Sequence, residues 1–441
     1  MAGSESGSSE PRTEIIRARP TKEFFISTLV RDIELIPSIA DLVDNSFDGA
    51  IRTRPDRNFA GLRVSIEIRP DHFKIGDNCG GIDPDIARNY AFCFGRPKGT
   101  PPLPHSVGQF GVGMKRALFK LGNWFRVDSS TSQWVYFVEE DVKAWSEDEE
   151  NWNFSMKGLR PAPGDVTPGT NILVKELNPS VSQDFARIEF KKRLMEDLAT
   201  RHHEALREGL VIEVDTIPVQ SKVLDLFASP RLRPGVRVYD VTPLPKGKSV
   251  HVRLVTGLFD GGDQNAADAG WYVFCNGRMV LAADKSTTTA WGFGGTIPRY
   301  HPQYSLFRGY AFFDSEDSSL LPWRTTKTEV DEDSLVYRGA RDEMAILARP
   351  VIDFINSIKE DTSQIHEEPD LGIVPVDSFA ASQTFTAPDM APRKKPKTEV
   401  TVSYQVLIRE ADAALEAIGA RNYREMGKKT FRYYYEAEVR R

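Results

Sequence analysis

The segment IADLVDNSFDGA, residues 39–50, constrains the fold more than any other part of the chain. Its apolar residues recur at helical spacing and a proline just before it suits a first helical turn, so we predict a helix over residues 37–52. At 100° per residue, Asp41, Asn45 and Asp48 fall within about 60° of one another and form a polar stripe. The apolar side can pack on a sheet, while the stripe faces either solvent or a polar site.

The composition is that of a soluble globular protein, since 40% of the 441 residues are hydrophobic and 27% are charged. The net charge of -6 does not favour a surface that is basic throughout, so nucleic acid is a possible partner only through a local patch. Three scattered cysteines predict neither a zinc site nor a disulfide framework. The chain has no signal-peptide core and no window of about 18 apolar residues, so we expect a soluble, intracellular, cytoplasmic protein that does not contact a membrane.

Alternation of apolar and polar residues predicts several strands and hairpins. LRVSIEI (62–68) reads as a strand with FKIGDN as its hairpin partner, and NILVKEL (171–177) reads as another strand. GWYVFCNGRMVL (270–281) predicts a hairpin with an Asn-Gly turn, and residues 343–360 predict a helix. The mixture of patterns indicates an α+β protein.

Shifts in composition divide the chain into five predicted parts. They are a disordered tail (1–13), a first mixed α/β domain (14–177), a second mixed α/β domain (178–360), a linker rich in Pro, Ser, Ala and Thr (361–403) and a short helical C-terminal segment (404–441). The last part reads as two helices broken at Gly419, with an aromatic cluster that suggests docking to a protein partner or dimerisation.

GDNCGGID (76–83) follows a predicted strand directly. Asp77 at the strand end can accept a hydrogen bond from an exocyclic amine, and Gly80 and Gly81 let the backbone approach a flat ligand closely. Taken alone, the segment is better explained as a glycine-rich turn capped by an Asx side chain.

HSVGQFGVGMKRALFKLG (105–122) places three glycines before a helix-forming run, where free backbone N–H groups can hold phosphates. It is neither a Walker A loop, because Met114 occupies the position of the required lysine, nor a dinucleotide fingerprint. The preceding FGRPKGTPPLP (94–104) suits a mobile lid. A fourth motif, PGTNILV, carries Thr170 at the start of a strand.

Together and in this order, the four segments resemble the GHKL ATPase superfamily of gyrase, the Bergerat-type heat-shock chaperone, histidine kinases and MutL. Within it, ADLVDNSFDGA and VFCNGRMV look most like the microrchidia group and its bacterial relatives. The resemblance implies a Bergerat-type ATP-binding α/β sandwich followed by a transducer-like α/β domain, with ATP and Mg²⁺ as cofactors.

The resemblance also implies roles for individual residues. Asn45 would hold Mg²⁺ against the triphosphate, Asp77 would read the adenine amino group with support from Thr170 through water, and Gly81 would lie under the base. Asp48 belongs to the same predicted nucleotide site. The residues implied to wrap the phosphates are Gly108, Gln109, Phe110, Gly111, Val112, Gly113 and Lys115.

Two positions depart from the family pattern. The usual general base is a glutamate four residues before the asparagine, and here that position holds the shorter Asp41. The family's DxGxG would place glycine at position 79, where this chain has Cys79, which narrows the adenine side. In the second domain, LPWRTTKTEVDED (321–333) carries Lys327 on a predicted loop before a helix. This matches the transducer lysine that contacts the terminal phosphate, and a lysine on a polar surface loop is the alternative explanation.

Three functions remain open from the sequence. The first is a slow ATPase that acts as a nucleotide-operated switch or as a clamp that homodimerises with ATP. The second is a protein kinase of the histidine-kinase type, which the absence of any histidine before His72 does not favour. The third is a non-hydrolysing ATP-binding adaptor, which Asp41 in place of glutamate keeps possible.

Overall fold

The computed structural model describes residues 21–31, 33–97, 99, 103–108, 111–221, 224–243, 247–259, 265–390 and 402–440. The chain divides into two compact units, Met1–Pro392 and Arg393–Arg441. The predicted tail over residues 1–13 and the predicted phosphate ligands Gln109 and Phe110 lie outside the described residues.

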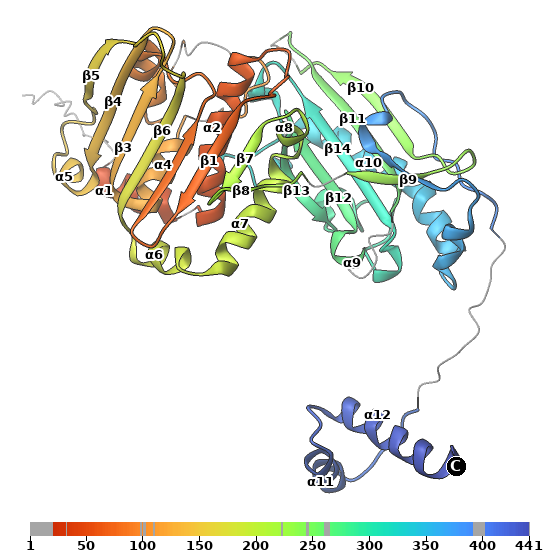
Figure 1. Cartoon of the computed structure of the whole chain (residues 1–441). Coiled ribbons are helices and arrows are strands. Elements are labelled where there is room, and N and C mark those ends of the chain that lie inside the picture. Colours follow the sequence, from red (N-terminus) through yellow and green to blue (C-terminus); the bar gives the residue numbers. More distant parts are fainter. Residues whose placement is uncertain are drawn as a thin grey trace, which may run out of the picture. The chain divides into compact units, whose positions relative to one another are not determined.

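Eight strands form the first sheet of the larger unit, in the order β5-β4-β3-β6-β2-β1-β7-β8 (Figure 1). They are β1 (Arg63–Ile68), β2 (His72–Asp77), β3 (Gly122–Ser130), β4 (Trp134–Asp141), β5 (Met156–Pro161), β6 (Gly169–Leu177), β7 (Val211–Val214) and β8 (Ile217–Pro218). All neighbours are antiparallel except β1 and β7. The predicted strands at 62–68 and 171–177 and the hairpin after the first of them are confirmed.

Burial alternates along β1, where Val64, Ile66 and Ile68 are buried while Arg63 and Ser65 are exposed. One face of the sheet is therefore covered, and the helices that pack around it include α1 (Lys22–Arg31), α2 (Leu35–Thr53), α4 (Gly113–Leu121), α6 (Pro179–Phe185) and α7 (Ile188–Arg201). The predicted helix at 37–52 is confirmed as α2, which begins slightly earlier. Because β7 and β8 lie beyond residue 177, the sheet takes strands from both predicted domains.

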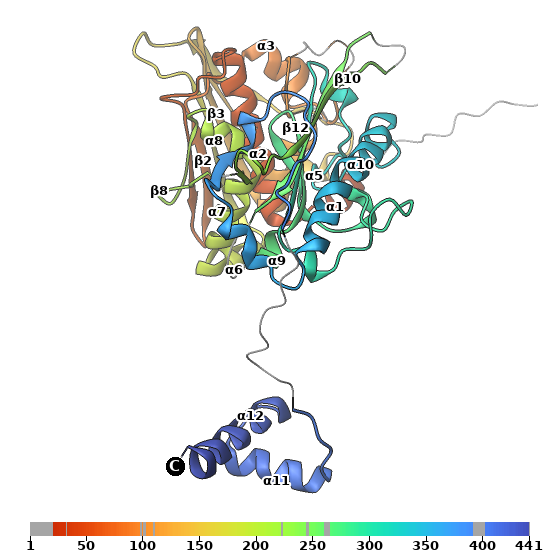
Figure 2. The same cartoon turned by 90° about the vertical axis from the view of Figure 1, so that its right-hand side faces the viewer.

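Five strands form the second sheet, in the order β10-β11-β14-β12-β13. They are β10 (Gly235–Val241), β11 (Val250–Leu258), β12 (Gly270–Cys275), β13 (Arg278–Asp284) and β14 (Phe307–Asp314). The predicted Asn-Gly hairpin is confirmed, with φ of 48° at Asn276 and 78° at Gly277. The helix predicted over residues 343–360 corresponds to α10 (Leu335–Ser357), which begins eight residues earlier. It packs on β10, β11 and β14 (Figure 2).

The other α-helices that the structure describes in the larger unit are short. They are α3 (Pro84–Ile86), α5 (Val142–Glu147), α8 (His203–Arg207) and α9 (Asn265–Asp268). Figure 1 shows α7 and α8 running between the first sheet and the hairpin strand β13 of the second, which they contact. This placement brings segments of both sheets close to α2.

The linker predicted over residues 361–403 differs from the structure. β15 (Gly372–Pro375) pairs with β9 (Asp225–Ala228), and Gln383 bonds with Val236 of β10. Isolated apolar residues in this segment, such as Ile365 and Val376, are buried. Single anchors of this kind produce no periodic pattern, which is why the sequence did not reveal them.

The smaller unit consists of α11 (Ile408–Ile418) and α12 (Tyr423–Tyr434), separated by Gly419 in the left-handed conformation. The two predicted C-terminal helices are therefore confirmed. Among the described residues, none of the helices has the length and apolar character needed to cross a membrane.

Candidate functional site

A cavity beside α2 brings together four of the predicted site residues. Asn45 comes from α2, Asp77 from the end of β2, Gly81 from the turn that follows and Thr170 from the start of β6. The rest of its wall is largely apolar, with Leu42, Ile75, Ile82, Met114 and Ile172 among the lining residues. An apolar slot with a few convergent polar groups suits a flat, partly polar ligand.

The Asp77 carboxylate is fixed by three donors. Oδ2 accepts from the Ser46 hydroxyl at 2.8 Å, and Oδ1 accepts from the backbone N–H groups of Cys79 at 2.9 Å and Thr170 at 3.3 Å. Burial raises the pKa of Asp77, while these hydrogen bonds oppose the rise. Thr170 thus contacts Asp77 directly through its backbone. An oriented carboxylate at the edge of an apolar slot can accept from an amine of a heterocycle.

Gly81 lines the cavity with φ of 71°, and the structure leaves no room for a side chain at this position. A Cβ there would lie 2.0 Å from the Ser130 backbone oxygen, so the close approach is to β3. Cys79 lines the same cavity, and burial raises the pKa of its thiol to about 12. The thiol is therefore protonated and occupies space as an apolar group.

Asn45 is exposed, unlike its neighbours on α2. Its amide makes no hydrogen bond with the part of the chain that the structure describes. A free amide oxygen at the mouth of the cavity fits a hard cation such as Mg²⁺, which retains several waters and takes other oxygens from phosphates. Asn45 thus meets the requirement for a metal ligand held jointly with a nucleotide.

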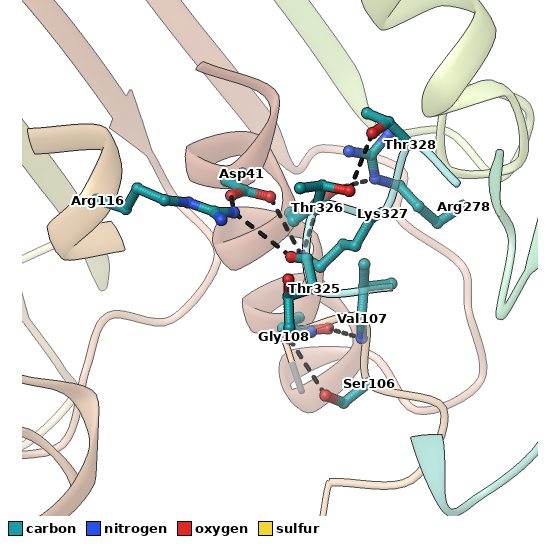
Figure 3. Close-up of polar contacts among 12 residues, drawn as sticks. Asp41, Ser106, Val107, Gly108, Arg116, Arg278, Thr325, Thr326, Lys327 and Thr328 are labelled. Carbon is teal, nitrogen blue, oxygen red and sulfur yellow. Dashed lines mark hydrogen bonds and ion pairs between the residues drawn. The ribbon is translucent and has the colours of Figure 1, made fainter. Parts of the chain in front are cut away.

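Asp48 holds the start of the glycine-rich segment, whose residues Ser106, Val107 and Gly108 are labelled in Figure 3. Its Oδ1 accepts from the Val107 N–H at 2.7 Å, and Oδ2 accepts from the Gly108 N–H at 2.7 Å and the Ser106 hydroxyl at 3.3 Å. A Cβ on Gly108 would lie 2.5 Å from Asp48 Oδ2. Asp48 is therefore placed to position the loop, and its predicted direct contact with nucleotide stays a prediction.

Lys115 is buried in the first turns of α4 and points at backbone oxygens. Its Nζ donates to Ala91 O at 2.8 Å and to Gly111 O at 2.6 Å, so it ties the glycine loop to the segment after α3. At the start of the helix, Val112 gives no side-chain cap to the free N–H groups. A Cβ on Gly113 would lie 3.2 Å from Asp41 Oδ2. These N–H groups are the donors available for an anion.

Burial lowers the pKa of Lys115 to about 7, against 10.5 for a free lysine. The unfolded chain then binds more protons than the folded chain between these values, so stability rises with pH through that window. We expect the free energy of unfolding to increase by about 2 kcal/mol from pH 7 to pH 9 because of this residue. Denaturant unfolding of the parent and Lys115→Met across this range measures the effect. An identical pH slope for the two proteins would contradict it.

Asp41 is buried and paired with two cations. Its Oδ2 accepts from Arg116 Nη2 at 2.8 Å, and its Oδ1 lies 3.5 Å from Lys327 Nζ. Lys327 sits in a turn before α10 with φ of 52°, and its side chain is buried (Figure 3). Burial alone would lower the pKa of Lys327, but the nearby Asp44 and Asp41 carboxylates outweigh it and raise the pKa. Two predicted catalytic residues distant in sequence therefore meet at α2.

Sequence reasoning missed Asp44, Arg116 and Arg278. Asp44 is fully buried and contacts Lys327 Nζ at 2.7 Å and Arg278 Nε at 2.8 Å. On a helical wheel it lies on the flank of the stripe, turned toward the apolar side. A carboxylate at that position indicates a buried ion pair, because a buried charge needs partners. The sequence offers no way to tell which basic residues supply them.

Residues 33–163 match the family model described as histidine kinase-, DNA gyrase B-, and HSP90-like ATPase. The match covers α2, the hairpin of β1 and β2, and the glycine-rich segment, and it supports an ATP-binding domain of the GHKL superfamily. It ends before Thr170 and does not include Lys327. A search among curated proteins finds no match to the chain.

Proposed function

We propose that this chain is a Mg²⁺-dependent, ATP-binding ATPase of the GHKL type that works as a nucleotide-operated switch. One observation carries the proposal. A single cavity gathers Asn45, Asp77, Gly81 and Thr170, while Lys327, from beyond the second sheet, reaches the same helix beside Asp41. The family match over 33–163 supports the ATP-binding part.

Each residue has a distinct proposed task. Asp77 accepts a hydrogen bond from the adenine amino group, and Asn45 supplies an oxygen to Mg²⁺, which would neutralise charge on the phosphates. The N–H groups at the start of α4 hold phosphate oxygens, and Lys327 distinguishes the terminal phosphate. Asp41 lies one turn before Asn45, where it orients or deprotonates an attacking water.

We further propose that ATP drives two copies together as a clamp, and that the microrchidia-like motifs reflect this mode of action. Lys327 comes from outside the first sheet. A terminal phosphate that binds Lys327 would therefore change the contacts between the segments of the two sheets. A ligand shifts such an equilibrium only by its differential affinity for the two states. The exposed aromatic residues of α12, Phe431, Tyr433 and Tyr434, offer a further surface for a protein partner.

Calorimetric titration and sedimentation test this function. We expect the parent to bind ATP in the presence of Mg²⁺ and to self-associate with a non-hydrolysable ATP analogue but not with ADP. Lys327→Ala should weaken that self-association because it removes the contact to the terminal phosphate. Absence of ATP binding would refute the proposal, and one sedimenting species under all three conditions would refute the clamp.

A second candidate function is a non-hydrolysing ATP-binding adaptor. One observation favours it: Asp41 is already paired with Arg116 at 2.8 Å and approached by Lys327 at 3.5 Å. A carboxylate held between two cations can serve as their structural partner without acting on water. Phosphate release separates the two functions, because the adaptor binds ATP without turnover.

A further inference from the structure

The carboxylate of Asp44 joins three segments that are distant in sequence. Oδ2 accepts from Lys327 Nζ at 2.7 Å, while Oδ1 lies 2.8 Å from Arg278 Nε of β13 and 2.9 Å from His202 Nε2 at the end of α7. Figure 3 shows Lys327 and Arg278 approaching α2 from separate segments. The helix that carries the nucleotide residues is thereby connected to the second sheet.

All four groups are buried, so their electrostatics are strong. Burial alone would raise the pKa of Asp44, but the neighbouring cations and the His202 hydrogen bond hold it well below its usual value. Burial lowers the pKa of His202, so its ring is neutral at pH 7 and donates through Nε2. Asp44 is therefore a permanent anion, and Lys327 is charged beside it.

Buried charges of both signs gather around Lys327. Asp41 and Asp44 face three cations, Arg116, Arg278 and Lys327, and the buried Asp48 carboxylate also interacts with the charge of Lys327. Within the described residues, Nη1 and Nη2 of Arg278 have no hydrogen-bond partner. Buried cationic nitrogen atoms without a partner are unfavourable, and an anion that binds nearby can supply one.

A lysine side chain has many rotamers, and fixing its ammonium in one position loses conformational entropy. Asp44 fixes the Lys327 ammonium before any ligand binds, at 3.5 Å from Asp41. We propose that Asp44, itself held by Arg278 and His202, is a positioning residue that presents Lys327 to the terminal phosphate of ATP. This inference rests on the proposed function and adds the residues that set its selectivity for ATP over ADP.

The consequence is specific because only ATP has the terminal phosphate. Loss of Asp44 should reduce affinity for ATP and leave affinity for ADP nearly unchanged, since Asp77 and Asn45 still hold the parts that the two nucleotides share. A residue that merely stabilises α2 would weaken both nucleotides alike. The ratio of the two affinities therefore separates positioning from general support.

The test is calorimetric titration of ATP analogue and ADP into the parent, Lys327→Met, Asp44→Asn and two double variants, Asp44→Asn/Arg278→Gln and Asp44→Asn/Lys327→Met. The variant Asp44→Asn/Arg278→Gln keeps the net charge of the parent cluster, so it covers the case in which Asp44→Asn fails to fold. We expect each Asp44 variant to lose roughly tenfold in preference for ATP over ADP. Lys327→Met should lose as much, and combining it with Asp44→Asn should give no further loss.

Glu368→Gln is the matched control, because Glu368 is a buried carboxylate that accepts from Arg231 and Ser229 away from α2. It should keep the parent preference. Folded Asp44 variants with an unchanged preference, or with equal losses for both nucleotides, would overturn the inference alone. A parent that binds neither nucleotide would overturn the proposed function and this inference with it.

Discussion

Asp41→Asn is expected to bind ATP nearly as well as the parent and to release phosphate at least about a hundredfold more slowly. The amide has the same size and still offers an oxygen to Arg116, whose Nη2 lies 2.8 Å from the parent carboxylate. It cannot take a proton from water. Steady-state phosphate release measured beside ATP affinity therefore isolates the loss to the chemical step.

Asp41→Glu provides the complementary measurement. Asp is one methylene shorter than the glutamate implied by the family resemblance, and a displacement of about 1 Å can change a rate roughly a hundredfold. Turnover by the parent should therefore be slow, and Asp41→Glu should keep ATP binding, with faster hydrolysis if reach limits the parent. If Asp41→Asn hydrolyses ATP as fast as the parent, Asp41 serves only as the partner of Arg116 and Lys327.

Asp77→Asn should reduce ATP affinity by roughly tenfold to a hundredfold, the range for a hydrogen bond to a charged group. The parent carboxylate accepts from Ser46, Cys79 and Thr170. An amide has only one oxygen. One of the two positions that accept hydrogen bonds in the parent would therefore hold an NH₂ group, which can only donate. The variant thus loses both the contact to adenine and the geometry of the slot.

Asp215→Asn is a suitable control for Asp77→Asn. Asp215 also accepts from a backbone N–H group, that of Ile68 at 3.0 Å, it is paired with Lys191, and it does not line the cavity beside α2. It should keep the ATP affinity of the parent. Guanine nucleotides should suffer less from Asp77→Asn, because guanine presents an oxygen where adenine presents an amine. Equal losses for ATP and GTP would remove Asp77 from recognition of the base.

Local patterns predicted much of the fold. The alternation in 62–68, the Asn276–Gly277 turn and the amphipathic segment of α2 each depend on residues close in sequence, and all three form as expected. The packing of 362–390 was missed because single buried anchors such as Val376 carry no period. Sequence spacing therefore reveals elements better than it reveals isolated tertiary contacts.

Several residues of the predicted site lie together in the structure, but the sequence did not predict their contacts. Asn45, Asp77, Gly81 and Thr170 line one cavity, as the motif order implied. Lys115, in contrast, donates to backbone oxygens in the structure. Partner choice inside a buried cluster depends on which long side chains meet in space, and one sequence does not encode that in any local pattern.

Asn276 connects the second sheet to the glycine-rich segment beside the cavity. Its Nδ2 donates to Ser106 O at 3.3 Å and to Ser315 O at 3.1 Å. The hairpin of the second sheet is therefore hydrogen-bonded to the start of the glycine-rich segment. A fragment that ends after β8 would lose this hydrogen bond. In that fragment, Asp44 would keep His202 but lose its other two partners, Arg278 and Lys327. The smallest piece of the chain that preserves the site therefore extends through the second sheet and Lys327, and truncation at the end of the first sheet would yield a damaged module.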